Sequence, residues 1–167
     1  FFSLWQLSHL GPSWFLCLSS LRWQATHSLS SFCCWYSAPF SGKWQAAMTR
    51  WEREAAPLKG VGVLVHHAAF TYLTHWLGMK ELGTLEPKPG IEPTSGQLSG
   101  LLARQQTAPA RMVLRTAYNP EGPSQWIASK TGMPAVLLPY TVGGTPAAKD
   151  LVGLFDDTLQ RLLQAVR

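Results

Sequence analysis

Short apolar runs alternate with helical patterns along residues 41–167, and this alternation restricts the folds that the chain can adopt. The first run, Val61–Val65, has the length and β-branched content of a strand buried on both faces, as in parallel sheets covered by helices. Similar runs follow at 81–85, 112–115 and 134–138. Strands that alternate with helices over short connections predict a three-layer α/β domain, with a mostly parallel four-stranded sheet flanked by helices.

Capping residues indicate where several of the helices begin. Ser41 is expected to cap a first helix, and Thr94 with Gln97 three residues later forms the pattern of a capping box. The last helix is expected to begin at Thr145, with Pro146 at its first helical position, where a missing N–H group costs nothing.

Residues 1–40 differ in composition from the rest of the chain. They contain no Asp, Glu or Lys, Arg22 is their one charged residue, and they hold all three cysteines. Their longest apolar run, Trp14–Leu18, is far shorter than the ~20 residues that span a bilayer. We therefore expect neither a transmembrane helix nor a signal peptide in this chain. A membrane anchor formed by these residues is an alternative.

The net charge of +5 does not indicate a nucleic-acid surface. Lys and Arg are scattered singly from Lys43 to Arg167, with no basic run interleaved with aromatic residues. The cysteines, with Cys33 and Cys34 adjacent, have neither CxxC nor zinc-finger spacing. We expect no nucleic-acid partner.

Chemically active side chains gather where the expected strands end. The carboxyl ends of parallel strands line one edge of a sheet, which predicts that His66, His67 and Glu86 lie at the same edge. Imidazole and carboxylate ligands suit Zn²⁺ or Mn²⁺. Successive strand residues face opposite sides, so His66 and His67 are not expected to reach one ion. The alternatives are a packing role for His67 and a solvated loop carboxylate for Glu86.

A second candidate site is the turn Gly143–Gly144–Thr145, whose N–H groups before a helix could bind an anion, with Arg115 as a further contact. The turn lacks the lysine of a P-loop, and a turn that merely enters a helix is the simpler interpretation. The sequence has no GxSxG motif and pairs no base with an orienting acid. A small α/β enzyme or anion-binding domain is therefore the alternative function.

Four segments resemble, in order, the second lobe of metal-binding proteins of ABC uptake transporters, the ZnuA/TroA-like family of zinc and manganese carriers. They are Trp44–Gly60, Val65–Leu73 with its paired histidines, Leu85–Ser95 and Leu138–Thr145. The resemblance covers essentially all of 41–167. It implies two α/β lobes joined by one long helix, with the metal between them.

The resemblance assigns parts of this chain to parts of that fold. Residues 41–60 would be the end of the linking helix, and 61–167 the C-terminal metal-binding lobe. His67 falls on the family's ligand from this lobe, and Glu86 falls where some manganese-type members place a carboxylate ligand. The loop Pro139–Thr141 lacks the Asp that many members supply as a last ligand.

The resemblance also implies a function without catalysis. The chain would belong to the periplasmic solute-binding component of a zinc/manganese ABC importer, which captures Zn²⁺ or Mn²⁺ as transported ligand and delivers it to the membrane permease. No organic cofactor is implied, and a monomer is expected. Its location would be the periplasm, or the outer face of the membrane through a lipid anchor.

Residues 1–40 do not resemble the first lobe, which supplies two further histidines in the family. Their composition leads us to expect an aberrant segment, disordered or translated out of frame. Two ligands leave a zinc site half-coordinated, so the chain is expected to bind metal weakly.

Overall fold

The computed structural model describes residues 39–88 and 90–167. The expectations for residues 1–38 lie outside the described residues. Residues 47–167 form one compact unit. Within the described residues no helix combines the length and the hydropathy needed to cross a bilayer.

Residues 47–167 contain a sheet of four parallel strands in the order β2-β1-β3-β4. Val63 of β1 pairs with Met112 of β3, and Val113 of β3 pairs with Ala135 of β4. The predicted number of strands and their parallel direction are confirmed. The strands are β1 (Gly62–Val65), β2 (Lys80–Thr84), β3 (Met112–Arg115) and β4 (Ala135–Leu137).

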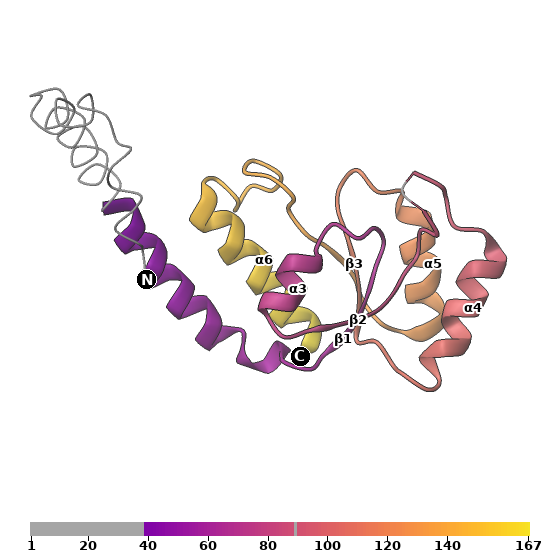
Figure 1. Cartoon of the computed structure of the whole chain (residues 1–167). Helices are drawn as coiled ribbons and strands as arrows, with labels where there is room; N and C mark the ends of the chain where they lie inside the picture. The colour runs from indigo at the N-terminus through magenta and orange to yellow at the C-terminus, as the bar shows by residue number, and fades with distance from the viewer. Residues whose placement is uncertain (1–38, 89) are drawn as a thin grey trace, which may run out of the picture. The chain divides into compact units, whose positions relative to one another are not determined.

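Helices cover both faces of the sheet, which confirms the three-layer arrangement. Figure 1 shows α4 and α5 together on one side of the strands, with α3 and α6 on the other. An unlabelled helix over residues 39–54 precedes the 3-10 turn η2 (Ala56–Leu58). The labelled helices are α3 (Thr71–Trp76), α4 (Ser95–Gln105), α5 (Glu121–Thr131) and α6 (Leu151–Val166).

Two of the expected helix starts are wrong, and one is confirmed. Residues 39 and 40 are already helical, so Ser41 lies inside its helix; Phe40 stacks on Trp44 one turn later, with ring centroids 6.0 Å apart. The last helix begins at Leu151 and not after Thr145, because the Asp150 carboxylate caps it by accepting from the Gly153 N–H at 2.7 Å. The capping box of Thr94 and Gln97 is present as predicted.

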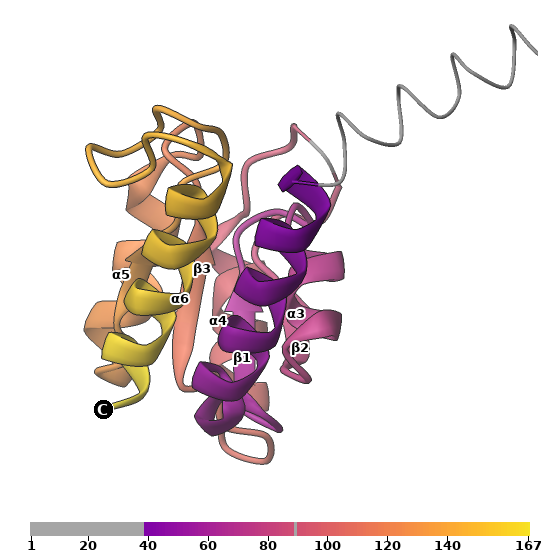
Figure 2. The ribbon, with the colours of Figure 1, turned by 90° about the vertical axis from the view of Figure 1, so that its left-hand side faces the viewer.

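Aromatic side chains pack where residues 47–54, α3 and α6 meet. Residues 47–54 run beside α6 (Figure 2), where the buried Trp51 stacks on Phe155 with ring centroids 5.0 Å apart. Trp76 of α3 meets Phe155 edge-on at 6.0 Å. The Trp51 indole N–H donates to the Asp156 carboxylate at 2.6 Å, so its polar atom is satisfied within this apolar layer.

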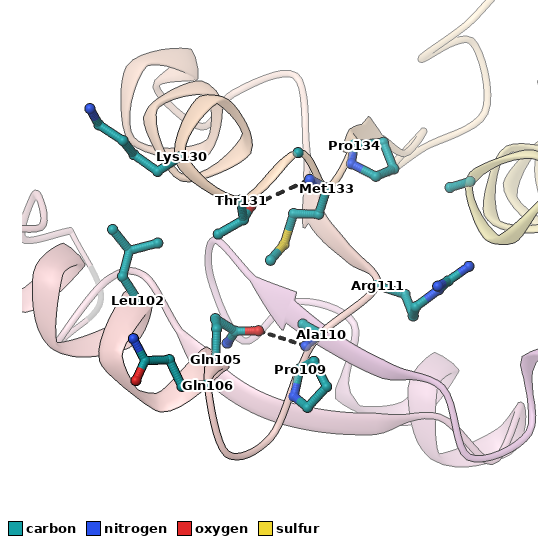
Figure 3. Close-up of a pocket in the computed structure, with 12 residues that line it drawn as sticks. Leu102, Gln105, Gln106, Pro109, Ala110, Arg111, Lys130, Thr131, Met133 and Pro134 are labelled. Atoms are coloured by element: carbon teal, nitrogen blue, oxygen red, sulfur yellow. Dashed lines mark hydrogen bonds between the residues drawn. The ribbon is translucent and has the colours of Figure 1, made fainter.

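A hollow of about 750 Å³ opens at the amino ends of β3 and β4 (Figure 3). Its lining includes Gln105, whose side-chain oxygen accepts from the Ala110 N–H at 2.6 Å, and the cations Arg111 and Lys130. Among the residues that the structure describes, no histidine or carboxylate lines it. It lies at the edge of the sheet opposite to the one where the strands end.

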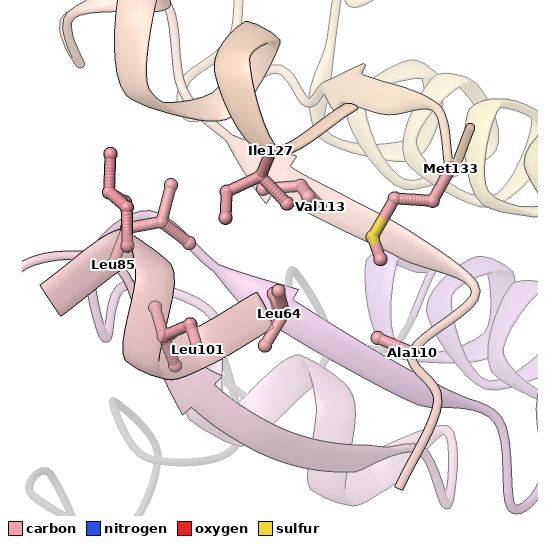
Figure 4. Packing of buried hydrophobic residues seen from close by; sticks show 8 residues of the cluster. Leu64, Leu85, Leu101, Ala110, Val113, Ile127 and Met133 are labelled. Atoms are coloured by element: carbon pink, nitrogen blue, oxygen red, sulfur yellow. The ribbon is translucent and has the colours of Figure 1, made fainter. Parts of the chain in front are cut away.

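The core on the α4 and α5 side is aliphatic. Leu64 of β1 and Val113 of β3 project from the centre of the sheet and meet Ile127 of α5 and Leu101 of α4 (Figure 4). Full burial of such a side chain contributes about 1.5–3 kcal/mol. Val63 and Val65, which alternate with Leu64 along β1, are also fully buried, so β1 is covered on both faces as its apolar run predicts.

Candidate metal site

The carboxyl end of β1 places two histidines directly after the strand. Val65 is the last strand residue, and His66 and His67 lie in the bend that follows. The His66 N–H donates to the Leu114 carbonyl of β3 at 2.8 Å, and the His66 carbonyl accepts from the Glu86 N–H at 3.1 Å. The backbone pairing of β1 and β2 thus continues for one residue and brings Glu86 beside the histidines.

The Glu86 carboxylate lies between the two imidazoles. His67 Nδ1 is 2.9 Å from Glu86 Oε2, which is a hydrogen-bond distance. His66 Nε2 is 3.5 Å from Glu86 Oε1, an electrostatic contact that is too long for a good hydrogen bond. Both imidazoles contact the Glu86 carboxylate, because side-chain alternation ends with the strand at Val65. That the two histidines do not reach one ion stays a prediction.

Glu86 is also not a solvated loop carboxylate. Its side chain is only 12% exposed, against 31% for His67. The Glu86 backbone carbonyl accepts from Thr84 Oγ1 at 3.1 Å. The carboxylate is therefore held in place by both its backbone and its histidine partners.

His66 is the most buried polar side chain of the group. Its exposure is 0%, and neither ring nitrogen has a hydrogen-bond partner among the described residues. Burial lowers the pKa of His66, the Glu86 carboxylate offsets part of this effect, and the charges of Arg115 and His67 lower the pKa further. His66 is therefore neutral at neutral pH.

A hollow of about 370 Å³ lies beside this group, at the edge where the strands end. His67 and Glu86 line it, together with Glu92 from the loop after β2 and Tyr118 and Asn119 from the loop after β3. The hollow therefore presents one imidazole and oxygen donors, the ligand types suited to a divalent transition metal. Within residues 39–88 and 90–167, no three His, Cys, Asp or Glu side chains are already gathered to hold an ion.

The structure supports the simpler interpretation of the turn Gly143–Gly144–Thr145, in which its polar groups bond within the chain. The Gly143 N–H donates to the Ala148 carbonyl at 2.6 Å, and the Gly144 N–H donates to the Thr141 carbonyl at 2.9 Å. Thr145 Oγ1 donates to the Asp157 carboxylate at 2.6 Å, and the helix begins six residues later. Arg115 is paired with Glu121 at 2.5 Å. The N–H groups of both glycines and the Thr145 hydroxyl thus already have acceptors within the chain.

Comparison with known proteins identifies the fold. The sequence model of the family described as "Zinc-uptake complex component A periplasmic" matches residues 37–165. The chain belongs to this family. No curated protein matches the chain significantly by sequence.

Solved structures of metal-binding and laminin-binding proteins share the fold. A crystal structure of ZnuA is similar with a TM-score of 0.62 and 20% identity over 78% of this chain and 46% of that one. The laminin-binding protein Lbp of Streptococcus pyogenes gives 0.61 and 17%, with coverage of 78% and 50%. FpvC from Pseudomonas aeruginosa, solved with Mn²⁺, gives 0.58 and 18%, with coverage of 78% and 49%.

These likenesses show the fold, and the chain spans about half the length of each of these relatives. They confirm the predicted α/β class, and the family model confirms the predicted family. The sequence did not single out Asn119 or Glu92 as lining residues. The signal that could have found them is their position in loops that follow β3 and β2, since such loops border the carboxyl edge of a parallel sheet.

Proposed function

We propose that the chain carries one lobe of a periplasmic binding protein that captures a divalent metal ion for an ABC importer and catalyses no reaction. Family membership supports the transport role. The observation that carries the metal role is the His67–Glu86 pair, 2.9 Å apart at the carboxyl edge of the sheet and beside an open hollow. Ligands of open α/β sheets bind at this edge.

The proposed cargo is Zn²⁺ or Mn²⁺, and the donors of this lobe favour Zn²⁺. Imidazole nitrogen is a good ligand for zinc, copper, iron and nickel, whereas oxygen-only sets suit manganese and magnesium. The FpvC relative has been solved with Mn²⁺ and with Ni²⁺, which supports a site that accepts several divalent ions. The metal is the transported substrate, and no organic cofactor is proposed.

Delivery of the ion to a membrane permease, outside the cytoplasm, completes the proposal. We propose that the binding protein acts as a monomer, either free in the periplasm or lipid-anchored at the outer face of the membrane. No nucleic-acid partner is proposed, because the Lys and Arg residues form no continuous patch in the sequence.

Titration calorimetry of the full chain with Zn²⁺ tests the metal role. We expect weak binding, with a dissociation constant on the order of micromolar or weaker, because the described residues supply at most His67 and Glu86 where zinc takes four ligands. His67→Ala should abolish the heat of binding.

The matched control is His75→Ala, which removes an exposed histidine of α3 that does not line the hollow. This variant should bind Zn²⁺ as the unmodified chain does. An equal loss of Zn²⁺ binding in His67→Ala and His75→Ala would contradict the assignment of His67 as a metal ligand. A nanomolar affinity that His67→Ala abolishes would contradict the expected weakness and show that residues beyond the described part add ligands.

A further inference from the structure

We propose that Glu86 is a positioning residue, which holds His67 in the tautomer with the proton on Nδ1, so that the ion is bound through His67 Nε2 and not through the Glu86 carboxylate. This inference rests on the proposed function, because it assigns roles within the same site. Under this inference His67 is the metal ligand of this lobe, and Glu86 orients His67 without binding the ion.

The first step is the position of the proton. His67 Nδ1 and Glu86 Oε2 are 2.9 Å apart, and an ionised carboxylate can only accept hydrogen bonds. The shared proton therefore belongs to Nδ1. A neutral imidazole that is protonated at Nδ1 carries its free lone pair on Nε2, at the far side of the ring. That nitrogen is the metal donor.

The second step is that both oxygens of the Glu86 carboxylate already contact a histidine. Oε2 accepts from His67, while Oε1 faces His66 Nε2 at 3.5 Å. If Glu86 turned toward an ion, the His67 Nδ1–H would lose its acceptor, and the buried His66 would lose its nearest anionic contact. Loss of the hydrogen bond between His67 and the carboxylate opposes this rotation.

The third step is the difference in exposure. The His67 side chain is 31% exposed and the Glu86 side chain 12% exposed, so the imidazole is the group more open to the hollow. Glu86 is also fixed through its backbone, whose N–H donates to the His66 carbonyl at 3.1 Å. Metal-binding histidines usually donate their second ring N–H to a carboxylate or carbonyl in this way.

Nitrogen-15 NMR of the metal-free full chain tests the tautomer directly. We expect His67 to show a protonated Nδ1 and an unprotonated Nε2, with its signals assigned by their loss in His67→Ala. Glu86→Gln should retain this tautomer, because the amide oxygen still accepts the hydrogen bond, whereas Glu86→Ala should shift His67 to the Nε2-protonated form. An Nε2-protonated His67 in the unmodified chain would overturn the proposal.

Binding of Co²⁺ tests whether Glu86 orients His67 or is itself a metal ligand. The visible bands of Co²⁺ depend on the number and type of its ligands, so Glu86→Gln and Glu86→Ala should leave the band shape unchanged. We expect affinity about 10–100-fold weaker in Glu86→Ala and closer to the unmodified value in Glu86→Gln. A changed band shape in both variants would make Glu86 a ligand and overturn the proposal.

The two tests also distinguish this inference from the proposed function. The tautomer is measured without metal, so it decides the orientation of His67 whether or not an ion binds. An unmodified chain that binds neither Zn²⁺ nor Co²⁺ would contradict the proposed function alone.

Discussion

His66 is neutral because its burial makes the charged imidazolium costly. Desolvation is the main cause of its lowered pKa, and the opposing charge of Glu86 does not compensate for it. In the unfolded chain the same side chain titrates near its ordinary value of 6.5. Below this pH the unfolded state binds a proton that the folded state does not accept.

We therefore expect the free energy of unfolding to fall as pH decreases below about 6.5, the ordinary pKa of histidine. The contribution of His66 is complete above pH 6.5 and is lost as pH falls from there toward the lowered pKa of the folded state. One proton contributes at most about 1.4 kcal/mol per pH unit. Urea unfolding of the full chain at several pH values measures the slope.

His66→Gln should flatten this slope, because glutamine does not titrate. His75→Gln is the matched control, since His75 is an exposed histidine of α3. Identical slopes in the two variants would show that His66 does not control the pH dependence.

At the scale of elements, tertiary contacts determine the residue at which α6 begins. Both Thr145 and Asp150 are residue types that cap helices. Thr145 Oγ1 is bonded to the Asp157 carboxylate on the side of the helix, while the Asp150 carboxylate accepts from the Gly153 N–H. The Thr145 hydrogen bond therefore holds the loop that contains it against α6 without making it part of the helix, and Arg161 of α6 also donates to Asp157 at 2.9 Å.

Two helical glycines are expected to respond in opposite ways to alanine. A Cβ at Gly100 of α4 would meet nothing within 4 Å, so Gly100→Ala should raise the free energy of unfolding by about 0.5–1 kcal/mol. A Cβ at Gly153 of α6 would lie 2.9 Å from the Ala147 carbonyl oxygen. Backbone cannot move aside as a side-chain end can, so Gly153→Ala should lower the free energy of unfolding.

Urea unfolding of the two variants beside the unmodified chain measures both changes. Each variant serves as the control for the other, because the same methyl group is added to a helix. An equal gain in stability from Gly153→Ala would contradict the close approach of Ala147 to α6.

At the scale of the whole molecule, residues 47–55 complete the aromatic layer against α6. Trp51 is fully buried, stacks on Phe155 and donates to Asp156, which Arg50 also contacts. Removing this segment would expose Phe155 and Trp76 and leave Asp156 without these two donors. The compact unit therefore depends on a segment that contributes no strand to the sheet.

A chain of residues 47–167 is expected to fold as the full chain does, because these residues form one compact unit. Its melting temperature should lie within a few degrees of that of the full chain. A chain of residues 56–167 should lose about 3–5 kcal/mol or more, the usual cost of deleting one buried aromatic side chain. Calorimetric melting measures both, and equal stability of the two truncated chains would contradict the role of Trp51.

Much of the fold was predictable because its signals are local. The apolar run that ends at Val65, the capping box at Thr94 and the strand Met112–Arg115 each depend on residues close together in the sequence. The parallel direction follows from the alternation of strands and helices over short connections. The place of His67 at the edge where the strands end follows from the same pattern.

The contacts of the site required the tertiary structure. Glu86 and the two histidines are separated by 19 or 20 positions, and the register of β1 with β2 decides that the carboxylate meets both imidazoles. The sequence alone determined the layers and the edge of the sheet that bears the candidate ligands, because period and capping are properties of neighbouring residues. Three features could be determined only from the folded chain, because each depends on burial or on hydrogen bonds between distant segments. They are the position of the proton on His67, the neutral state of His66 and the start of α6 at Leu151.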